Sequence, residues 1–496
     1  MPRRFPLWLM ICSTLSGCMV GPDYQLPSLD TPADWHEAKP KDCPSKMEQS
    51  SYAHSMSFGG HSYAQDAVPA GCATRSPQGV GWWQDFDDPV LNDLVERALK
   101  NNENLQVAAA RIAEVRGLRE SANAALFPHV DAAAGSQRGN PGVTTLGGNV
   151  SVHQAAFDAA WEIDLFGGTR RQVEAQDALI GAREAAYRNA ALSLSAEVAR
   201  EYVTLRQFQA QMTITRQTAQ TQHGLYDIVQ DRYKGGLVST LDVAQAETLY
   251  KTTLAKLPDF EQQIKTSSYR LSVLLGENPG NLDKLAADSA PIPVANRLPV
   301  LDAPAGIIRS RPDVAEAERN LAAATASQGV AISALYPKVS LSSMFGIQHA
   351  AWPVGHYLST KDIWNIGGNV SMPILEFGSI EGQINAANAR QVQALHQYRQ
   401  TVLAALGDVE TDLSNLTEES RRHKLLHDAG SSADHAVNVA KDRYGNGLVD
   451  FTTVLQAEQQ RFGVQLDLAA SQSAIAQDII ALHKALGENP APSQQQ

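Results

Sequence analysis

Apolar residues recur at heptad spacing along a segment between Gly168 and Tyr233 that contains no proline. The stripe is formed by Ile180, Tyr187, Leu194, Val198, Leu205, Met212, Ala219, Tyr226 and Tyr233. This repeat predicts a long helix whose seam packs against other helices, and the four-residue step after Leu194 is a stutter that locally unwinds a supercoil. A helix of this length would span about 100 Å. We therefore expect a coiled coil or a helical barrel, with an ordinary helical bundle as the alternative.

The chain contains two copies of one pattern. The sequence Arg-Tyr-x-x-Gly-Leu-Val begins at Arg232 and recurs at Arg443, and other short matches follow at nearly the same offset. Matches in the same order along so much of a chain indicate internal repeats. They predict one repeat at 89–279 and a second at 306–490, with a proline-rich linker at 280–305 between them and a short tail at 491–496.

Each repeat is expected to contain an alanine-rich helix, two strands, the long helix, a turn and a return helix. Strand-like alternation of apolar residues is clearest in the second repeat, at 339–348 and 364–374. The expected elements of the first repeat are a helix at 89–126, strands at 130–138 and 150–163, the long helix at 168–233 and a return helix that ends near Leu275. Pro258 is expected to kink this return helix.

Composition narrows the class of protein. The 496 residues include 41 Lys and Arg against 53 Asp and Glu, a formal net charge of −12. This balance argues against a nucleic-acid binder with a basic surface, and no stretch is long and apolar enough for a polytopic helical membrane protein. Common signatures of hydrolases, phosphate-binding loops and zinc sites are absent. We expect no enzyme activity, no catalytic residue, no metal site and no cofactor.

The N-terminus has the pattern of an export signal. Two arginines precede the apolar stretch Phe5–Leu15, which is too short to span a bilayer. Small residues then lead to Cys18, as in the bacterial lipobox, so residues 1–17 are expected to be cleaved and Cys18 to be acylated. An ordinary signal peptide is the alternative. The residue after this cysteine is Met19 and not aspartate. In this respect the chain resembles lipoproteins that are delivered to the outer membrane.

Two further cysteines, Cys43 and Cys72, flank a loop rich in Ser, Gly and His within the N-terminal segment 18–88. In an exported protein such a pair predicts one disulfide. A soft-metal site formed by the scattered His and Met side chains of the loop is the less favoured interpretation.

These landmarks together resemble the TolC-type outer-membrane efflux channels, in particular the NodT-type lipoprotein branch of the outer membrane factor family. The matching stretches are Gly21-Pro22-Asp23-Tyr24 after Cys18, Trp82-Trp83-Gln84-Asp85-Phe86, Arg311-Pro312-Asp313-Val314 and the two Arg-Tyr-x-x-Gly-Leu-Val turns. The resemblance implies a mainly α-helical homotrimer with a membrane β-barrel. Four strands per chain would close a twelve-stranded barrel in the outer membrane, continued by a twelve-helix α-barrel in the periplasm.

The resemblance also implies a function. The trimer would be a passive conduit that exports small molecules from an inner-membrane pump of the RND type, reached through a periplasmic adaptor protein. The chain would be anchored to outer-membrane lipid through acylated Cys18 and would bind no nucleic acid. A structural periplasmic coiled-coil lipoprotein without channel activity is the alternative, but it does not explain two pairs of strands with apolar alternation. The sequence does not identify the transported substrate, the pump or the adaptor.

In this family the helix turns meet the adaptor and residues close to them narrow the channel entrance. The residues placed at the adaptor contact are Gly235, Gly236, Leu237, Val238, Gly447, Leu448 and Val449. The residues placed at the periplasmic gate are Asp242, Asp450, Arg232, Tyr233, Arg443 and Tyr444. The four glycines of the turns, including Gly445, are expected to allow positive φ and close approach. Ordinary helix-turn residues and solvated acids at helix starts are the alternative interpretations.

Overall fold

The structure is a computed structural model of the full chain. It describes residues 19–28, 31–37, 56–58, 61–63, 81–139, 150–299, 301–352 and 357–488. The predicted lipidation site Cys18 and the predicted Cys43–Cys72 disulfide lie outside the described residues and stay predictions.

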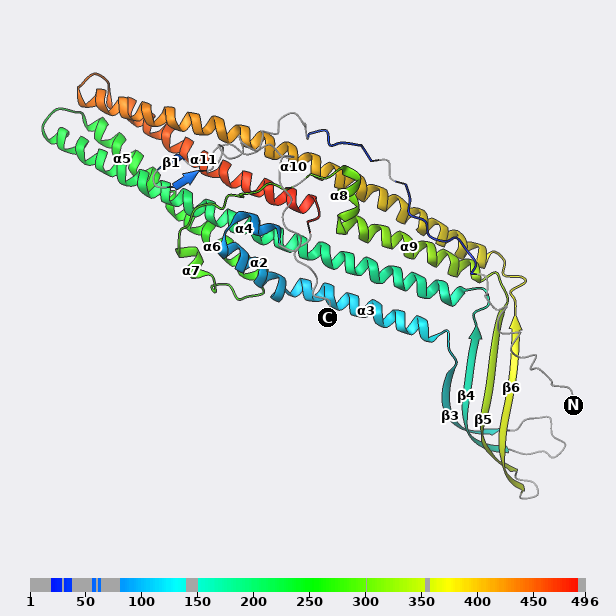
Figure 1. The fold of residues 1–496 in the computed structure, drawn as a ribbon. Coiled ribbons are helices and arrows are strands. Elements are labelled where there is room, and N and C mark those ends of the chain that lie inside the picture. The colour runs from blue at the N-terminus through cyan, green and yellow to red at the C-terminus, as the bar shows by residue number, and fades with distance from the viewer. Residues whose placement is uncertain are drawn as a thin grey trace. The chain divides into compact units, whose positions relative to one another are not determined.

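Helices form most of the described chain (Figure 1). The elements of the first repeat are α2 (Pro89–Asn101), α3 (Glu103–Ala124), β3 (His129–Gly139), β4 (Val150–Ile163), α4 (Gly168–Lys234), α5 (Thr240–Leu254) and α6 (Leu257–Leu274). Those of the second are α8 (Pro304–Ser310), α9 (Pro312–Ser333), β5 (Lys338–Trp352), β6 (Tyr357–Ser371), α10 (Ser379–Gly445) and α11 (Phe451–Ala485). The remaining elements are β1 (Met56–Phe58), β2 (His61–Tyr63), the 3-10 helix η3 (Trp82–Phe86) and α7 (Asp283–Ala287).

The chain forms two compact units, and each contains parts of both repeats. The first unit comprises Met1–Leu29, Ala110–Ala185 and Ala315–Gln400, and the second comprises Asp30–Ala109, Ala186–Val314 and Thr401–Gln496. The four long strands therefore belong to the first unit, and both helix turns belong to the second.

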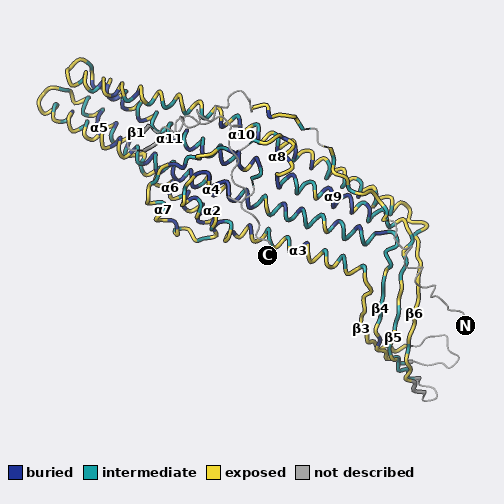
Figure 2. Tube along the Cα trace, in the orientation of Figure 1, coloured by how far each residue is buried: buried dark blue, intermediate teal, exposed yellow. Residues whose placement is uncertain are grey.

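The long helix is confirmed in both repeats, because α4 and α10 each contain 67 residues. The predicted seam of α4 is buried within the second unit at Leu194, Val198, Leu205, Met212 and Ala219 (Figure 2). Tyr233 is 44% exposed, so the buried seam ends before the turn.

The alanine-rich helix of the first repeat is interrupted at Asn102, which the sequence analysis did not predict. The Nδ2 of Asn102 donates to the carbonyl of Leu274 at 2.9 Å, and its Oδ1 accepts from the N–H of Leu105 at 3.1 Å. The side chain thus caps α3 and ties it to the end of α6, which favours a break over a continuous helix.

The return helix of the first repeat is also divided. It ends at Leu254, and α6 begins at Leu257 with Pro258 in its first turn. Proline is tolerated in the first turn of a helix but removes a hydrogen bond from a helix interior. Ala255 and Lys256, between the two helices, keep right-handed helical dihedrals, so the expected kink takes the form of a two-residue interruption. The region interpreted as a linker without periodicity contains the short helix α7 and the start of α8.

The four long strands form one antiparallel sheet in the order β3-β4-β5-β6 (Figure 1). The pairing of β4 with β5 joins the two repeats, with Phe157 opposite Phe345. Trp364 of β6 lies opposite Phe345 in turn, and these three side chains are 61%, 65% and 72% exposed. Because side chains alternate between the faces of a sheet, they lie on one face, where the other described residues leave these apolar side chains largely uncovered.

The opposite face of the sheet is polar. Asp131 pairs with Asp158, which pairs with Met344 and then with Asn365 across the four strands. One apolar and one polar face are the pattern of a barrel wall between lipid and an aqueous lumen. Among the helices of the described residues, none combines the length and apolar character required to cross a membrane.

The core of the second unit is built around η3 and the middle of the long helices. Trp82 and Trp83 are 2% exposed, and the Nε1 of Trp82 donates to the Oγ of Ser195 at 3.3 Å. The ring of Trp82 stacks on that of His483 in α11, with centroids 5.3 Å apart.

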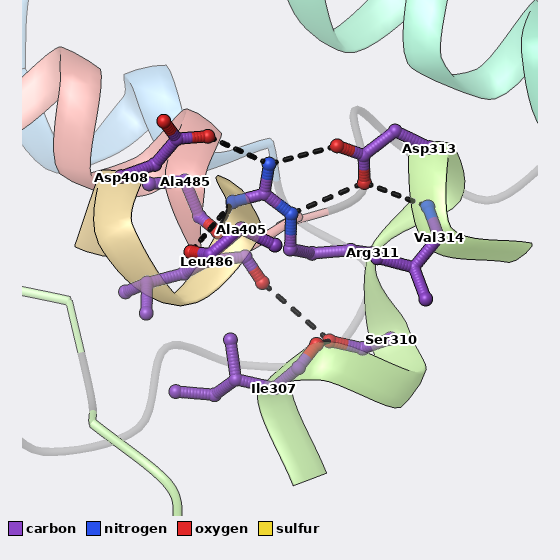
Figure 3. A network of polar contacts seen from close by, with 9 residues as sticks. All are labelled: Ile307, Ser310, Arg311, Asp313, Val314, Ala405, Asp408, Ala485 and Leu486. Atoms are coloured by element: carbon purple, nitrogen blue, oxygen red, sulfur yellow. Dashed lines mark hydrogen bonds and ion pairs between the residues drawn. The ribbon is translucent and has the colours of Figure 1, made fainter. Parts of the chain in front are cut away.

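Arg311 joins three helices in the same unit (Figure 3). Its guanidinium donates to the carbonyl of Ala485 at 2.7 Å and to carboxylate oxygens of Asp313 and Asp408 at 2.8 and 3.0 Å. Burial of Asp313 opposes its ionisation, but the hydrogen bonds and the charge of Arg311 outweigh this and lower the pKa of Asp313. The Arg-Pro-Asp-Val segment is thus a structural junction between α9, α10 and α11.

Candidate functional site

The two helix turns have the same backbone geometry. At the end of α4, the N–H groups of Gly236 and Leu237 donate to the carbonyls of Tyr233 and Arg232, each at 2.9 Å. After α10 the corresponding pairs are Gly447 with Tyr444 at 3.1 Å and Leu448 with Arg443 at 2.9 Å. This pair of bonds defines the Schellman motif, which satisfies the last carbonyls of a helix.

A positive φ is required at one glycine in each turn. Gly236 has a φ of 72° and Gly447 a φ of 71°, the left-handed conformation that side chains with a Cβ rarely adopt. Gly235 and Gly445 do not have positive φ. Of the four glycines expected to allow positive φ, the turns use one each, because the motif needs only one left-handed residue.

Apolar side chains project from both turns. Leu237 is 76% exposed and Leu448 is 72% exposed, while Val238 and Val449 are half-buried. Val238 packs against a small core between the hairpins that includes Val229 and Phe451. The leucines are therefore free for a contact outside the chain, whereas the valine of the first turn helps to hold the hairpins together.

The two candidate acids have different surroundings. Asp242 forms a capping box with Ser239: its Oδ2 accepts from the N–H and the hydroxyl of Ser239 at 2.9 and 2.8 Å, and the N–H of Asp242 donates back to the Ser239 hydroxyl at 3.3 Å. Asp450 occupies the N-cap of α11, but its side chain makes no capping hydrogen bond and is exposed. The first acid is engaged in its own helix start, and the second is available for other contacts.

Arg232 and Tyr444 link the two hairpins. The guanidinium of Arg232 lies over the ring of Tyr444, 4.9 Å from its centroid, and this ring packs against Phe451 at 5.2 Å. The hydroxyl of Tyr444 is buried without a hydrogen-bond partner in the structure. Two of the predicted pairing residues are thus brought together, whereas the other two, Tyr233 and Arg443, are exposed.

A buried charge cluster below the second turn was missed by the sequence analysis. Glu458 of α11 is 0% exposed and forms ion pairs with Lys441 of α10 at 2.6 Å and with Arg461 at 2.8 Å. Burial raises the pKa of nearby Asp434, with Arg461 opposing this shift and Glu458 adding to it. In the sequence, the only sign of this cluster is that Arg461 follows Glu458 by one helical turn. Oppositely charged pairs at this spacing are common on solvated helices and do not indicate burial.

Comparison with known proteins identifies the family. The sequence matches the family model described as outer membrane efflux protein over residues 94–277 and 304–488. The chain belongs to the outer membrane efflux protein family. The two matched ranges correspond to the two repeats, which accounts for the likeness of the turns.

Relatives and solved structures agree with this membership. Nodulation protein T of Rhizobium leguminosarum bv. trifolii is 26% identical and covers 96% of each chain. The pyoverdine export outer membrane protein OpmQ of Pseudomonas aeruginosa is 30% identical and covers 82% of this chain and 86% of its own length. The structure of the outer-membrane channel OprN has a TM-score of 0.83 at 32% identity and covers 96% of this chain and all of its own.

As an outer membrane efflux protein of the NodT type, the chain is an outer-membrane channel of an efflux system and extends into the periplasm. Its family is one of channels, not of enzymes. An apolar sheet face is the surface that an outer-membrane barrel turns towards lipid.

The N-terminal segment of this outer membrane efflux protein is fixed at the start of α4. Arg171 is 1% exposed and donates to the carbonyls of Val20 and Gly21 at 3.1 and 3.2 Å and to the carboxylate of Asp23 at 2.7 Å. A side chain at Gly167 would collide with Met19. The residue that follows Cys18 is thus held where β4 leads into α4.

Proposed function

We propose that three copies of the chain close a twelve-stranded barrel and a twelve-helix tube that act as a passive conduit. The open four-stranded sheet carries this proposal. Among the described residues β3 and β6 each pair on one side only, and the hydrocarbon region of a membrane does not tolerate unpaired strand edges. Pairing of β3 with β6 of the next copy satisfies both edges.

The turns are the surface that meets a periplasmic adaptor. Leu237 and Leu448 offer exposed apolar contact, and the glycines beside them allow close approach of another backbone. Relatives are named as outer-membrane proteins of efflux pumps in Pseudomonas putida, which supports an inner-membrane pump as the further partner. We assign this pump to the RND type on the resemblance of the whole chain.

The entrance is closed at rest by contacts near the turns. Arg232 holds Tyr444 and thereby keeps the two hairpins of one chain together. Asp450, with an exposed carboxylate, provides one acid per chain, and three copies form a ring that favours cations. Asp242 contributes to closure mainly by fixing the start of α5 through its capping box.

Single-channel recording in planar bilayers tests this gate. We expect the double variant Asp242→Ala, Asp450→Ala to raise conductance and to lower the preference for cations, because it removes the charge and loosens the start of α5. Asp450→Asn alone is expected to reproduce the change in selectivity. Asp242→Asn keeps a capping acceptor and serves as the matched control. A double variant with unchanged conductance and selectivity would exclude both acids from the gate.

The lipid anchor is tested separately. We propose that Cys18 is acylated and that Arg171 holds the following residues against α4, which fixes the anchor beside the membrane strands. Metabolic labelling with palmitate is expected to mark the wild-type chain and not a Cys18→Ser variant. Equal labelling of both would contradict the assignment.

A separate experiment distinguishes a channel from a purely structural lipoprotein. Heat-modifiable trimers that conduct ions are expected for a channel, and monomers without conductance for a structural lipoprotein.

A further inference from the structure

Two histidines face each other across the strand pair that joins the repeats. His153 of β4 is directly opposite His349 of β5 in the register, and their ring centroids are 6.3 Å apart. Both are separated from Phe157 and Phe345 by an even number of residues, so they lie on the same face of the sheet as these aromatic side chains. His153 is exposed and His349 is half-buried. Each histidine is three residues from a strand end, since β4 begins at Val150 and β5 ends at Trp352. The pair therefore lies beyond the aromatic row, where the lipid-facing side of a barrel wall approaches the polar interface.

The position of these strands keeps the pair accessible in an assembled barrel. β4 and β5 are the two central strands of the sheet, so the edges that pair with other copies are β3 and β6. Closure of the barrel therefore does not change the strand pairing that places the two histidines opposite one another. Because β4 belongs to the first repeat and β5 to the second, an ion shared by the two rings would connect the repeats.

One of the rings is already oriented by a neighbour. The Nδ1 of His349 lies 2.9 Å from the Oγ1 of Thr360 on β6. In the tautomer in which Nδ1–H donates to this hydroxyl, the Nε2 of His349 has a free lone pair. A hydrogen bond to the second ring nitrogen is the usual support of a histidine that binds a metal ion.

We propose that His153 and His349 bind a divalent transition-metal ion of the Ni²⁺, Cu²⁺ or Zn²⁺ class. Neutral imidazole is a preferred ligand of these ions, and cross-strand side chains directly opposite one another are close enough to share one after small rotations. The described residues contain no group of three or more His, Cys, Asp or Glu that could hold a metal. Water or phosphate oxygens complete the coordination, so the site exchanges its ion readily.

Titration calorimetry of the full-length protein with Ni²⁺, purified in detergent without a histidine tag, tests the site. Wild type is expected to bind one more ion per chain at pH 7.5 than His153→Ala or His349→Ala. Thr360→Val is expected to weaken this binding by about tenfold, the scale of a lost supporting hydrogen bond. His129→Ala is the matched control, because His129 lies on the polar face of the same sheet, opposite Ala160, and its binding should equal that of wild type.

A second measurement keeps the test independent of the other histidines of the chain. The ion should raise the temperature at which the folded barrel converts to the slower-migrating form on gels, because it binds only when β4 and β5 are paired. This rise should vanish in both histidine variants, which must first elute like wild type to show that they are folded. Equal stoichiometry, affinity and thermal shift in wild type and the two variants would overturn the proposal, whatever the outcome for the gate.

Discussion

The chain has two helical hairpins, one formed by α4 and α5 and the other by α10 and α11. Their turns have the same geometry, but different interactions stabilise the helices next to each turn, which we call the stems. In the first, Ser239 and Asp242 cap the return helix, and Glu247 pairs with Lys251 on the surface. In the second, the position equivalent to Glu247 is Glu458, which is completely buried between Lys441 and Arg461. The second stem is therefore tied across its two helices by a buried ion pair, whereas α4 and α5 of the first meet through packing, as between the rings of His223 and Tyr250 at 4.9 Å.

The return helices of the two hairpins also differ, because one is interrupted and the other is continuous. The first is broken before Pro258, whereas α11 runs through the equivalent position, Ala469, without interruption for 35 residues. A shared type of turn on unlike stems is what we expect if both turns make the proposed contact with a partner that presents equivalent surfaces.

The largest expected effect comes from the buried charge. Glu458→Gln should destabilise the second hairpin by about 3 kcal/mol, because removal of one member of a buried ion pair leaves its partners uncompensated. Glu247→Gln in the first hairpin is the matched control. Loss of the ion pair between Glu247 and Lys251 should barely change stability, because this pair is solvated. Denaturant unfolding of the detergent-purified protein measures both. Equal effects would show that the stems do not differ in the way described.

A proline exchange tests the unequal return helices. Ala469→Pro should cost about 3 kcal/mol, since it removes a hydrogen bond from a continuous helix. The reverse change, Pro258→Ala, replaces a residue in the first turn of α6 and should leave thermal unfolding close to that of wild type. If Ala469→Pro is tolerated as well as Pro258→Ala, the continuity of α11 has no structural importance.

The smallest expected effect concerns the turns, where the hairpins should behave alike. Gly236→Ala and Gly447→Ala each place a Cβ at positive φ and should cost about 1–2 kcal/mol. Gly235→Ala and Gly445→Ala add a methyl group without that strain and are the controls. Local hydrogen exchange of the turn amides reports the change. Different costs at Gly236 and Gly447 would contradict the equivalence of the two turns.

The periodicity of apolar residues predicted those elements in which a single repeat, heptad or alternating, extends along most of the element. The heptad stripe gave α4 almost to its last residue. Alternation gave both strands of the second repeat, but β6 begins seven residues earlier and ends three residues earlier than the predicted 364–374. The breaks at Asn102 and before Pro258 were harder to predict, because a capping side chain and a tolerated proline depend on what packs nearby. The turn residues were evident from the repeated motif, whereas burial of Glu458 depends on Lys441, which is distant in sequence and reaches it only across the folded hairpin.

Contact between the turns and an adaptor is the central claim, and photo-crosslinking in cells tests it most directly. A photoreactive amino acid would replace Leu237 or Leu448, the exposed side chains of the two turns. Leu425 of α10, which is 63% exposed, is the control on the stem. We expect both turn positions to capture the same periplasmic adaptor, and position 425 to capture none. Capture of the adaptor only from the stem, or from neither turn, would contradict the proposed role of the turns.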